Sequence, residues 1–401
     1  MYNIFVAHVF GIVYICGLLN GIIMDKPFVY DRYVTGKSFV GRKYDCNILG
    51  NLLEAGEHVV IYEPPKSGKM SVIQQTLFNM RAVGKQFMVS HVNMFNVRTI
   101  EEFLIKFGTA MIRPLYSTAQ EYADVVAEYL PDTHFVFDRE RFASSEEVVS
   151  LESEADDADI EAMPRLPSRI RAAKGVPYYM ILEEFQNIMK DKGYESVLKV
   201  MERVLADRES AVTFIFTGPQ VNAMKYIFAE VKWFNRLVEH LPLQKVDDRE
   251  ITDYIIKGLM MSGRVVEREL IMGACELFRG QMWYLNHFIS ICDTMTRGYV
   301  NEGILMDALK VLLSIHEPRF MAIVNDLTDH QLSLLRAVLD GVVRFSASDV
   351  IEKYALNSSA NVRRVKDALK KKEVLTFNEK DEPLILDPLF EYWVGRKYFG
   401  I

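Results

Sequence analysis

Cysteine is scarce in this chain of 401 residues, and no two cysteines have the C-x-x-C spacing. The four that occur stand far apart, at Cys16, Cys46, Cys275 and Cys292. This pattern excludes zinc ribbons and thioredoxin-like redox motifs, and it argues against a disulfide framework. We therefore expect the chain to work in a reducing compartment, the cytoplasm.

An excess of positive charge is also missing. Asp and Glu number 54 against 47 Lys and Arg, which gives a net charge of −7. This balance argues against a generally basic nucleic-acid-binding protein, although local basic patches can still occur. Half of the residues are hydrophobic, so a chain of this length can bury the cores of two or three domains.

Asp, Glu, Lys and Arg are all absent between Ile4 and Ile23, a run long enough to span a bilayer. The run has neither the basic n-region nor the cleavage site of a signal peptide. Residues 1–23 are either a membrane anchor with a cytoplasmic body, since Lys26 and Arg32 follow, or an upstream extension of a protein that starts at Met24. We expect the second, because the fold can be traced from Met24 onward.

The stretch from Val59 to Ser71 has the pattern of a buried strand, a tight loop and a helix start. A P-loop needs this context, because loop N–H groups and the helix N-terminus surround phosphates while a lysine reaches the terminal ones. The residues expected to bind a nucleotide here are Pro64, Pro65, Lys66, Ser67, Gly68, Lys69, Met70 and Ser71.

Two positions depart from the pattern G-x-x-x-x-G-K-[ST]. Glu63 stands at the first glycine, where its carboxylate is expected to repel phosphate. Met70 stands where a Ser or Thr would bind Mg²⁺. The loop therefore predicts ATP binding with a weakened Mg²⁺ site and slow or absent hydrolysis.

Two further apolar runs end in polar side chains. Residues 178–182 lead into Glu183 and Glu184, the Walker B arrangement, in which the first acid holds Mg²⁺ and the second polarises the attacking water. Residues 212–216 lead into Thr217, which suits a sensor of the γ-phosphate. The alternative for each is a strand that simply ends in polar residues.

Strands that alternate with helices predict an α/β fold, a doubly wound parallel sheet of the P-loop NTPase kind, AAA+-like in the order of its motifs. We assign residues 24–245 to this ATPase domain. Within it, residues 146–161 carry eight acidic and no basic residues. That composition predicts a solvated, mobile insertion, with docking of a basic partner as the alternative.

The remainder is helical at first. Apolar periodicity predicts a helical lid over residues 246–320, with helices at about 248–261, 267–278, 281–297 and 302–317. Trp283 and Tyr284 could flank a base there or pack in the core. Residues 321–401 predict a winged helix. Its third helix, Ser358–Lys371, is basic on the outside, but Asp367 and an acidic hairpin favour a protein contact over DNA.

From about Pro27 onward, the chain resembles a prokaryotic ATPase family common in archaea and Bacteroidetes, related to the AAA+ and STAND ATPases. The residues that carry the resemblance are Phe39-Val40-Gly41-Arg42, the P-loop, Ile181–Gln186, Phe216–Gly218, Gly280–Tyr284 and Asp387–Trp393. It implies ATP binding, a lid, a winged helix that senses the nucleotide, and a basic residue facing phosphate, for which Arg236 is the candidate. The departures are Glu63, Met70, Glu183, Asn93 and Met282.

Two functions remain open at this point. The first is a nucleotide-dependent switch that binds ATP and ADP, with Glu184 and Arg236 as catalytic residues, Glu183 as metal ligand and Thr217 at the phosphate. The second is a scaffold or a DNA-binding winged-helix regulator with a vestigial nucleotide site. A protein partner is expected in either case, and the AAA+-like fold also allows a homo-oligomer.

Overall fold

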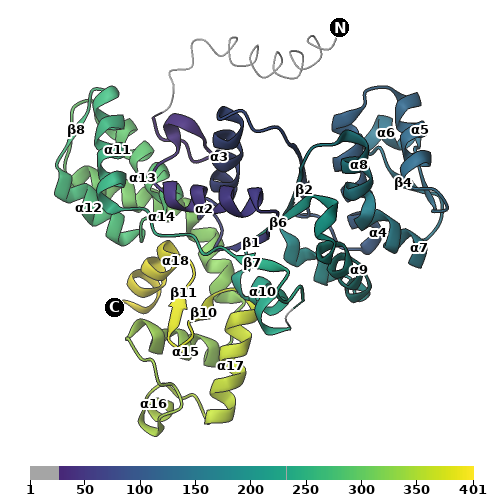
Figure 1. Cartoon of the computed structure of the whole chain (residues 1–401). Coiled ribbons are helices and arrows are strands. Elements are labelled where there is room, and N and C mark those ends of the chain that lie inside the picture. Colours follow the sequence, from purple (N-terminus) through teal and green to yellow (C-terminus); the bar gives the residue numbers. More distant parts are fainter. Residues whose placement is uncertain (1–26, 232) are drawn as a thin grey trace.

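The computed structural model describes residues 27–231 and 233–401, and its centre is a five-stranded sheet (Figure 1). The strand order is β2–β5–β6–β1–β7, with every neighbouring pair parallel. The strands are β1 (His58–Tyr62), β2 (Met88–Asn93), β5 (Tyr178–Glu183), β6 (Val212–Gly218) and β7 (Val238–His240). The prediction of a doubly wound parallel sheet is confirmed.

The two faces of the sheet pack on different helices because successive side chains of a strand point to opposite sides. Val59 and Ile61 pack with α2 (Lys43–Glu54) and α3 (Lys69–Ala82). Val60 and Tyr62 belong to the larger core on the other face, which includes α4 (Ile100–Ile112) and α9 (Tyr194–Ala206). Burial on both faces explains why β1, β5 and β6 are continuous apolar runs.

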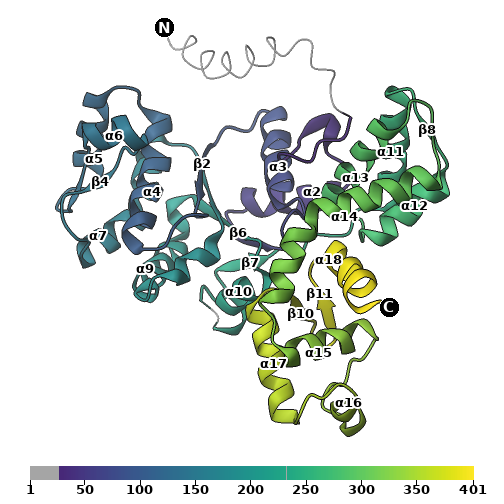
Figure 2. The same ribbon diagram turned by 180° about the vertical axis from the view of Figure 1, so that it is seen from behind.

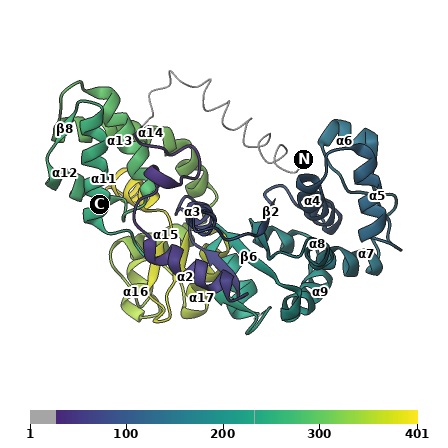
Figure 3. The same cartoon turned by 45° about the horizontal axis from the view of Figure 1, so that its top comes forward.

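Between β2 and β5 lies an insertion on the side of the sheet away from the lid (Figures 1 and 3). After α4 it contains α5 (Ala119–Tyr129), β3 (Phe135–Val136), α6 (Arg139–Ser145), β4 (Ser150–Leu151), α7 (Asp157–Ala162) and α8 (Leu166–Lys174). The expectation that residues 146–161 are solvated is wrong for Val148, Val149, Ser150 and Asp159, which are buried. Val148 and Val149 are fully buried, and their N–H groups donate to Thr109 Oγ1. These two valines anchor a segment whose composition otherwise predicts solvation.

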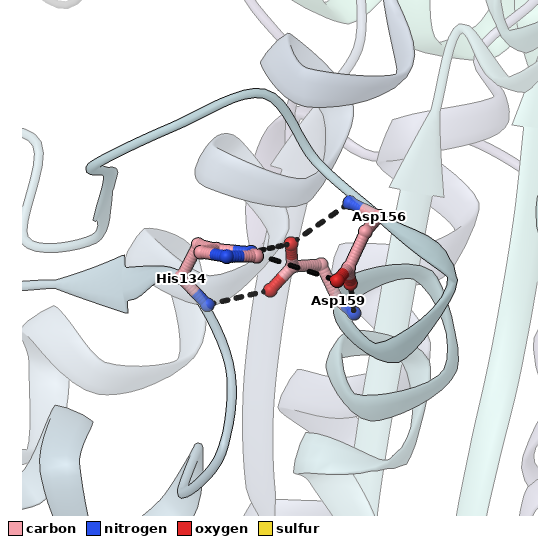
Figure 4. A group of neighbouring side chains, drawn as sticks. All are labelled: His134, Asp156 and Asp159. Carbon is pink, nitrogen blue, oxygen red and sulfur yellow. Dashed lines mark hydrogen bonds and ion pairs between the residues drawn. The ribbon is translucent and has the colours of Figure 1, made fainter.

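A second anchor of this segment is the cluster of His134, Asp156 and Asp159 (Figure 4). The fully buried Asp159 accepts hydrogen bonds from the backbone N–H groups of His134, at 2.8 Å, and Asp156, at 3.0 Å. His134 Nδ1 lies 2.9 Å from the same carboxylate, and this hydrogen bond raises the pKa of His134. The ligand-type atoms lie within 4.8 Å of one another, but Asp159 is already satisfied by protein donors. We interpret the cluster as a set of structural hydrogen bonds that fixes the start of α7.

The lid follows β7, on the opposite side of the sheet from the insertion (Figures 1 and 2). Its elements are α11 (Asp248–Met261), β8 (Val265–Val266), α12 (Arg268–Leu277), α13 (Met282–Met295), β9 (Tyr299–Val300) and α14 (Glu302–Asn325). The winged helix contains α15 (Asp329–Leu339), α16 (Ser348–Lys353), α17 (Ser359–Lys371), the antiparallel hairpin β10 (Leu375–Phe377) and β11 (Pro383–Ile385), and α18 (Pro388–Trp393).

The lid and the winged helix share one hydrophobic core. Helix α14 runs through the expected boundary at residues 320 and 321 and contains Pro318. Phe320 on this helix packs against Phe390 and Trp393 of α18. The two parts are therefore joined by a continuous helix rather than by a linker.

The short elements complete the fold. They are α10 (Val221–Lys225), the 3₁₀ turns η1 (Gly36–Ser38), η2 (Arg113–Leu115), η3 (Met163–Arg165), η4 (Phe185–Lys190) and η5 (Arg208–Ser210), and the π-helical turns η6 (Tyr226–Glu230) and η7 (Val394–Phe399). The apolar run 4–23 lies outside the described residues, so its two interpretations stay predictions. Within residues 27–231 and 233–401, no helix combines the length and apolar character that crossing a bilayer requires.

Candidate functional site

A cavity of about 660 Å³ opens at the carboxyl ends of β1, β5 and β6. This is the edge of a parallel α/β sheet at which ligands bind, and the volume suits a small-molecule ligand. The lining residues come from the P-loop (Pro65–Ser71), the strand ends (Glu183, Glu184 and Thr217–Gln220), residues 29–34, Phe95, the lid (Met282, Trp283 and Asn286) and the winged helix (Glu373 and Leu386).

Lys69 is held by the P-loop itself. Its ammonium group donates to the carbonyl oxygens of Glu63, at 2.8 Å, and Pro64, at 3.0 Å, with Ser67 Oγ at 3.4 Å. Burial lowers the pKa of Lys69 to about 8. The charges of Glu63, Glu184 and Glu183 oppose this fall, but the direct partners of the ammonium group are neutral oxygens, and a phosphate entering the cavity could form an ion pair with it.

Glu63 is not among the residues that line the cavity, which argues against the expectation that it repels phosphate. Its carboxylate accepts a hydrogen bond from the backbone N–H of Leu243 at 3.2 Å. Burial raises the pKa of Glu63, while the charges of Lys69 and Arg42 oppose that rise. Glu63 therefore ties the P-loop to the segment after β7.

Ser71 has a structural partner. Its Oγ accepts a hydrogen bond from the N–H of Val34 at 3.1 Å, and one turn later Gln75 Oε1 accepts from the N–H of Gly36 at 2.7 Å. These bonds hold residues 29–34 against α3 as one wall of the cavity. Met70 lines the cavity with a thioether in place of a hydroxyl, so position 70 offers no oxygen ligand to Mg²⁺.

The two predicted acids both reach the cavity, each with a partner. Glu183 Oε2 accepts from Asn93 Nδ2 at 3.2 Å and lies 2.8 Å from His91 Nε2. Glu184 has a left-handed backbone, with φ of 60°, and accepts from Gln186 Nε2 at 2.7 Å. Carboxylate oxygens are suitable ligands for Mg²⁺, so Glu183 could hold the ion and Glu184 could polarise water.

Thr217 stands beside Glu183 in the register of β5 and β6. Its Oγ1 is buried and has no hydrogen-bond partner among residues 27–231 and 233–401. An unpaired buried hydroxyl is costly, and a ligand oxygen in the cavity could satisfy it. The structure thus brings Thr217 together with the P-loop and both acids.

The structure does not bring Arg236 to this cavity. Val238 pairs with His58 at the amino-terminal end of β1, whereas the P-loop follows the carboxyl end of that strand. Arg236 precedes Val238 by two residues and is exposed. The assignment of Arg236 as a catalytic residue of this site is therefore wrong, because strand direction places it at the opposite edge of the sheet.

Where residues 29–34 and the lid meet, the cavity is bounded by aromatic rings. Tyr30 stacks on His287 with ring centroids 4.3 Å apart, and Lys66 Nζ lies 3.2 Å from the centroid of the Trp283 ring. Asn286 Nδ2 donates to the carbonyl oxygen of Val29 at 2.8 Å, which holds residues 29–34 against the lid. Trp283 therefore lines the cavity, which is the position that flanking a base would require.

Tyr284 packs in the core, which was the alternative to flanking a base. It is buried, and its hydroxyl donates to Asp387 at 2.9 Å. Arg319 Nη2 donates to the same carboxylate at 2.7 Å, and Asp387 Oδ1 accepts from the N–H groups that begin α18. Asp387 thus joins the lid, α14 and the winged helix.

Several parts of the site were not expected from sequence, and Arg42 lies beside the P-loop without lining the cavity. Residues 29–34 carry no recognisable motif, and Glu373 lies far away in the chain. Arg42 belongs to the Phe39–Arg42 motif that carries part of the family resemblance. That motif was the sequence signal from which Arg42 could have been predicted. Its buried Nη1 has no partner in the described part of the chain and would lie 3.8 Å from a Cβ added at Gly68. Burial lowers the pKa of Arg42.

Comparisons with known proteins agree with this architecture. A family profile described as "probable winged helix domain" matches residues 318–396. No curated protein matches the chain in sequence. A solved structure of the Walker-type ATPase PABY2304 of Pyrococcus abyssi is similar over 91% of this chain and 99% of that chain, with a TM-score of 0.63 and 14% identity.

The ORC2 protein of Aeropyrum pernix, solved as ADPNP–ADP complexes, is similar over 88% of this chain and 93% of that chain, with a TM-score of 0.52 and 15% identity. The ADP form of that protein is similar over 90% of this chain and 95% of that chain, with a TM-score of 0.53 and 15% identity. Identities this low speak for the fold alone. The chain has the AAA+ type of P-loop ATPase fold, followed by a winged-helix domain.

Proposed function

We propose that the chain binds ATP and ADP and acts as a nucleotide-dependent switch. The observation that carries the proposal is the composition of the cavity wall. The P-loop, the ends of β5 and β6, the lid and the winged helix all contribute to one cavity. A ligand there would contact the P-loop, the strand ends, the lid and the winged helix at the same time.

The phosphates are proposed to lie on the P-loop, against Lys69 and the loop N–H groups. The base then falls between residues 29–34 and the lid, where Tyr30 and Trp283 line the cavity. The nucleotide-bound solved structure of the A. pernix ORC2 protein supports this use of a similar fold.

Hydrolysis is proposed to be slow or absent. A P-loop ATPase holds Mg²⁺ with a hydroxyl at the helix start and an acid at the strand end. Here Met70 removes the first ligand, and His91 and Asn93 already contact the second, Glu183. Glu184 keeps the position of the residue that polarises water, so binding without efficient turnover is the expected state.

Calorimetric titration of the full chain with ATP and with ADP, each with and without Mg²⁺, tests this function. We expect both nucleotides to bind, with affinities that change little when Mg²⁺ is removed. Absence of binding by either nucleotide would leave the scaffold function in its place. A brisk Mg²⁺-dependent turnover, above about 1 s⁻¹, would contradict the proposed slow hydrolysis.

DNA binding by the winged helix is a second candidate. Arg363, Arg364 and Lys371 are exposed on α17. Other basic side chains there are engaged in ion pairs, Lys366 with Asp381 and Lys370 with Glu230. Duplex binding that weakens steeply with salt and is lost in the Arg363→Ala, Arg364→Ala double variant would favour it. Without such binding, a protein partner or a second copy of the chain is the expected ligand of this surface.

A further inference from the structure

A row of polar side chains at the carboxyl end of the sheet carries an imidazole as well as oxygen ligands. Asn93, Glu183 and Thr217 lie side by side in the register of β2, β5 and β6. Met70, in the first turn of α3, adds no oxygen at this end of the sheet. The side chain that reaches Glu183 is that of His91, two residues before Asn93 on the edge strand β2.

His91 and Glu183 are spaced as two neighbouring ligands of one metal ion. His91 Nε2 lies 2.8 Å from Glu183 Oε2. Neighbouring ligands of an octahedral ion with bonds of about 2.1 Å lie about 3 Å apart. An ion that takes the place of the shared proton is therefore held by both atoms with little movement of the two strands. The two side chains are 35% and 25% exposed, so an ion can reach them from solvent.

The unpaired hydroxyl of Thr217 is an independent sign of a ligand at this place. Thr217 is fully buried, and its Oγ1 has no hydrogen-bond partner in the described ranges 27–231 and 233–401. Thr217 is paired with Glu183 across β6 and β5, and both residues line the cavity. A metal-bound water or a phosphate oxygen beside Glu183 would give this hydroxyl the partner that it lacks.

Two protein ligands are enough for a metal ion that accompanies a nucleotide. In phosphate-binding sites such an ion is typically held by one or two side chains, with phosphate oxygens and water as its other ligands. Glu183 lines the same cavity as Lys69, where the phosphates are proposed to lie. The difference in this chain is the second ligand, a nitrogen instead of a hydroxyl oxygen. Mg²⁺ prefers oxygen, whereas imidazole suits transition-metal ions, and affinity for nitrogen ligands rises toward Co²⁺ and Ni²⁺.

We infer that His91 and Glu183 form a site for a divalent transition-metal ion of the Co²⁺, Ni²⁺ or Zn²⁺ class, and that this ion accompanies the bound nucleotide in place of Mg²⁺. The inference rests on the proposed nucleotide binding and names the cation for it. Met70 then accounts for the weakened Mg²⁺ site, and His91 determines which ions bind instead. Mg²⁺ leaves the hydrogen bond between His91 and Glu183 intact because it gains little from a nitrogen ligand.

The test measures the Kd of ATP for the full chain by calorimetry in saturating Mg²⁺ and in saturating Co²⁺. We expect ATP to bind about tenfold more tightly, or better, with Co²⁺, because even a residue that only supports a metal ligand changes metal affinity by about tenfold or more. His91→Ala removes the nitrogen ligand and should bring the two Kd values together. His330→Ala removes an imidazole from α15 of the winged helix and should keep the difference.

His91→Gln separates metal binding from hydrogen bonding. Its amide can still donate to Glu183 but offers no imidazole nitrogen, so this variant should lose the preference for Co²⁺ as His91→Ala does. The visible absorption of Co²⁺ gives a readout that does not depend on affinity. The spectrum of the wild-type complex with Co²⁺ and ATP should differ from the spectra of both His91 variants, because one nitrogen ligand is lost.

The outcomes distinguish this inference from the proposed function. Equal ATP Kd values with Mg²⁺ and Co²⁺ in the wild type would show that His91 only bonds to Glu183, and would overturn the inference alone. A preference for Co²⁺ that persists in His91→Ala or His91→Gln, or a Co²⁺ spectrum that is the same in all three proteins, would do the same. Failure of the wild type to bind ATP or ADP with either ion would overturn the proposed function together with the inference.

Discussion

The ammonium group of Lys66 lies over the ring of Trp283, 3.2 Å from its centroid, so the P-loop and the lid are in direct contact. Lys66 has a left-handed backbone, with φ of 65°, and burial lowers its pKa to about 8. A cation over an indole face is attracted to it, but phosphate is a stronger partner for an ammonium group. The pair is therefore expected to separate when a nucleotide binds.

Trp283 should report nucleotide binding by its fluorescence. Loss of the Lys66 contact changes the surroundings of the indole, so its emission should shift in intensity or wavelength as ATP is added. Trp283→Phe should abolish the signal, whereas Trp233→Phe, which alters a partly buried ring of the ATPase core, should keep it. An unchanged spectrum at saturating ATP, with binding confirmed by calorimetry, would show that the pair persists.

Lys69→Met should weaken ATP binding by about tenfold or more, or roughly 1.4 kcal/mol, because the phosphates lose their cation. The same change should stabilise the free protein. The pKa of Lys69 falls from 10.5 to about 8 on burial, so keeping this charge at neutral pH costs about 3 kcal/mol. The stability gap between variant and wild type should therefore be widest below pH 8.

The pKa shift of Lys69 also predicts how the stability difference between wild type and variant changes with pH. Between about pH 8 and 10.5 the unfolded chain holds a proton on Lys69 that the folded chain has lost, so wild-type stability rises relative to Lys69→Met across this interval. Urea unfolding of both proteins from pH 7 to 10 measures it. A gap that stays constant over this range would contradict a buried, shifted ammonium group.

Met70→Thr should make ATP affinity depend on Mg²⁺. The hydroxyl would return one oxygen ligand beside Glu183, which improves the octahedral set that Mg²⁺ demands. Calorimetry with and without Mg²⁺ should show a difference of several-fold that is absent in the wild type. Met70→Ala is the matched control, because it removes the same thioether without adding an oxygen. Equal Mg²⁺ dependence in the two variants would rule out a role for the missing hydroxyl.

Glu63→Gln and Glu63→Ala should differ in stability but not in ATP affinity. The glutamine amide can still accept from the Leu243 N–H group, whereas alanine leaves that donor without its partner at a cost of about 1–3 kcal/mol. Thermal unfolding measures the first effect and calorimetry the second. A marked gain in ATP affinity in both variants would show that the carboxylate does oppose phosphate.

The elements with strong local patterns were predictable. Helix α11 begins at Asp248 and ends at Met261, as its apolar spacing indicated, and the strand ends at Glu183 and Thr217 meet in one cavity. These features depend on periodicity and on parallel strand ends sharing an edge, and both can be read from the sequence alone.

Side-chain direction and chain direction were not predictable. Glu63 occupies a P-loop position, but nothing in its neighbours along the chain shows that it turns toward Leu243. Arg236 lies close in sequence to the sensor strand, but β7 starts at the opposite edge of the sheet. Glu373 reaches the cavity only because the winged helix folds back onto α10. Such contacts join residues more than a hundred positions apart, which local patterns do not specify.

Helix α14 makes the lid and the winged helix one lever. Its 24 residues give a length of about 36 Å, so a rotation of about 10° at the lid end would carry the far end through about 6 Å. Pro318 removes one helical N–H bond at the residue where the winged-helix family match begins. That position is where the lever can bend, and a cut between the two domains would have to pass through the helix itself.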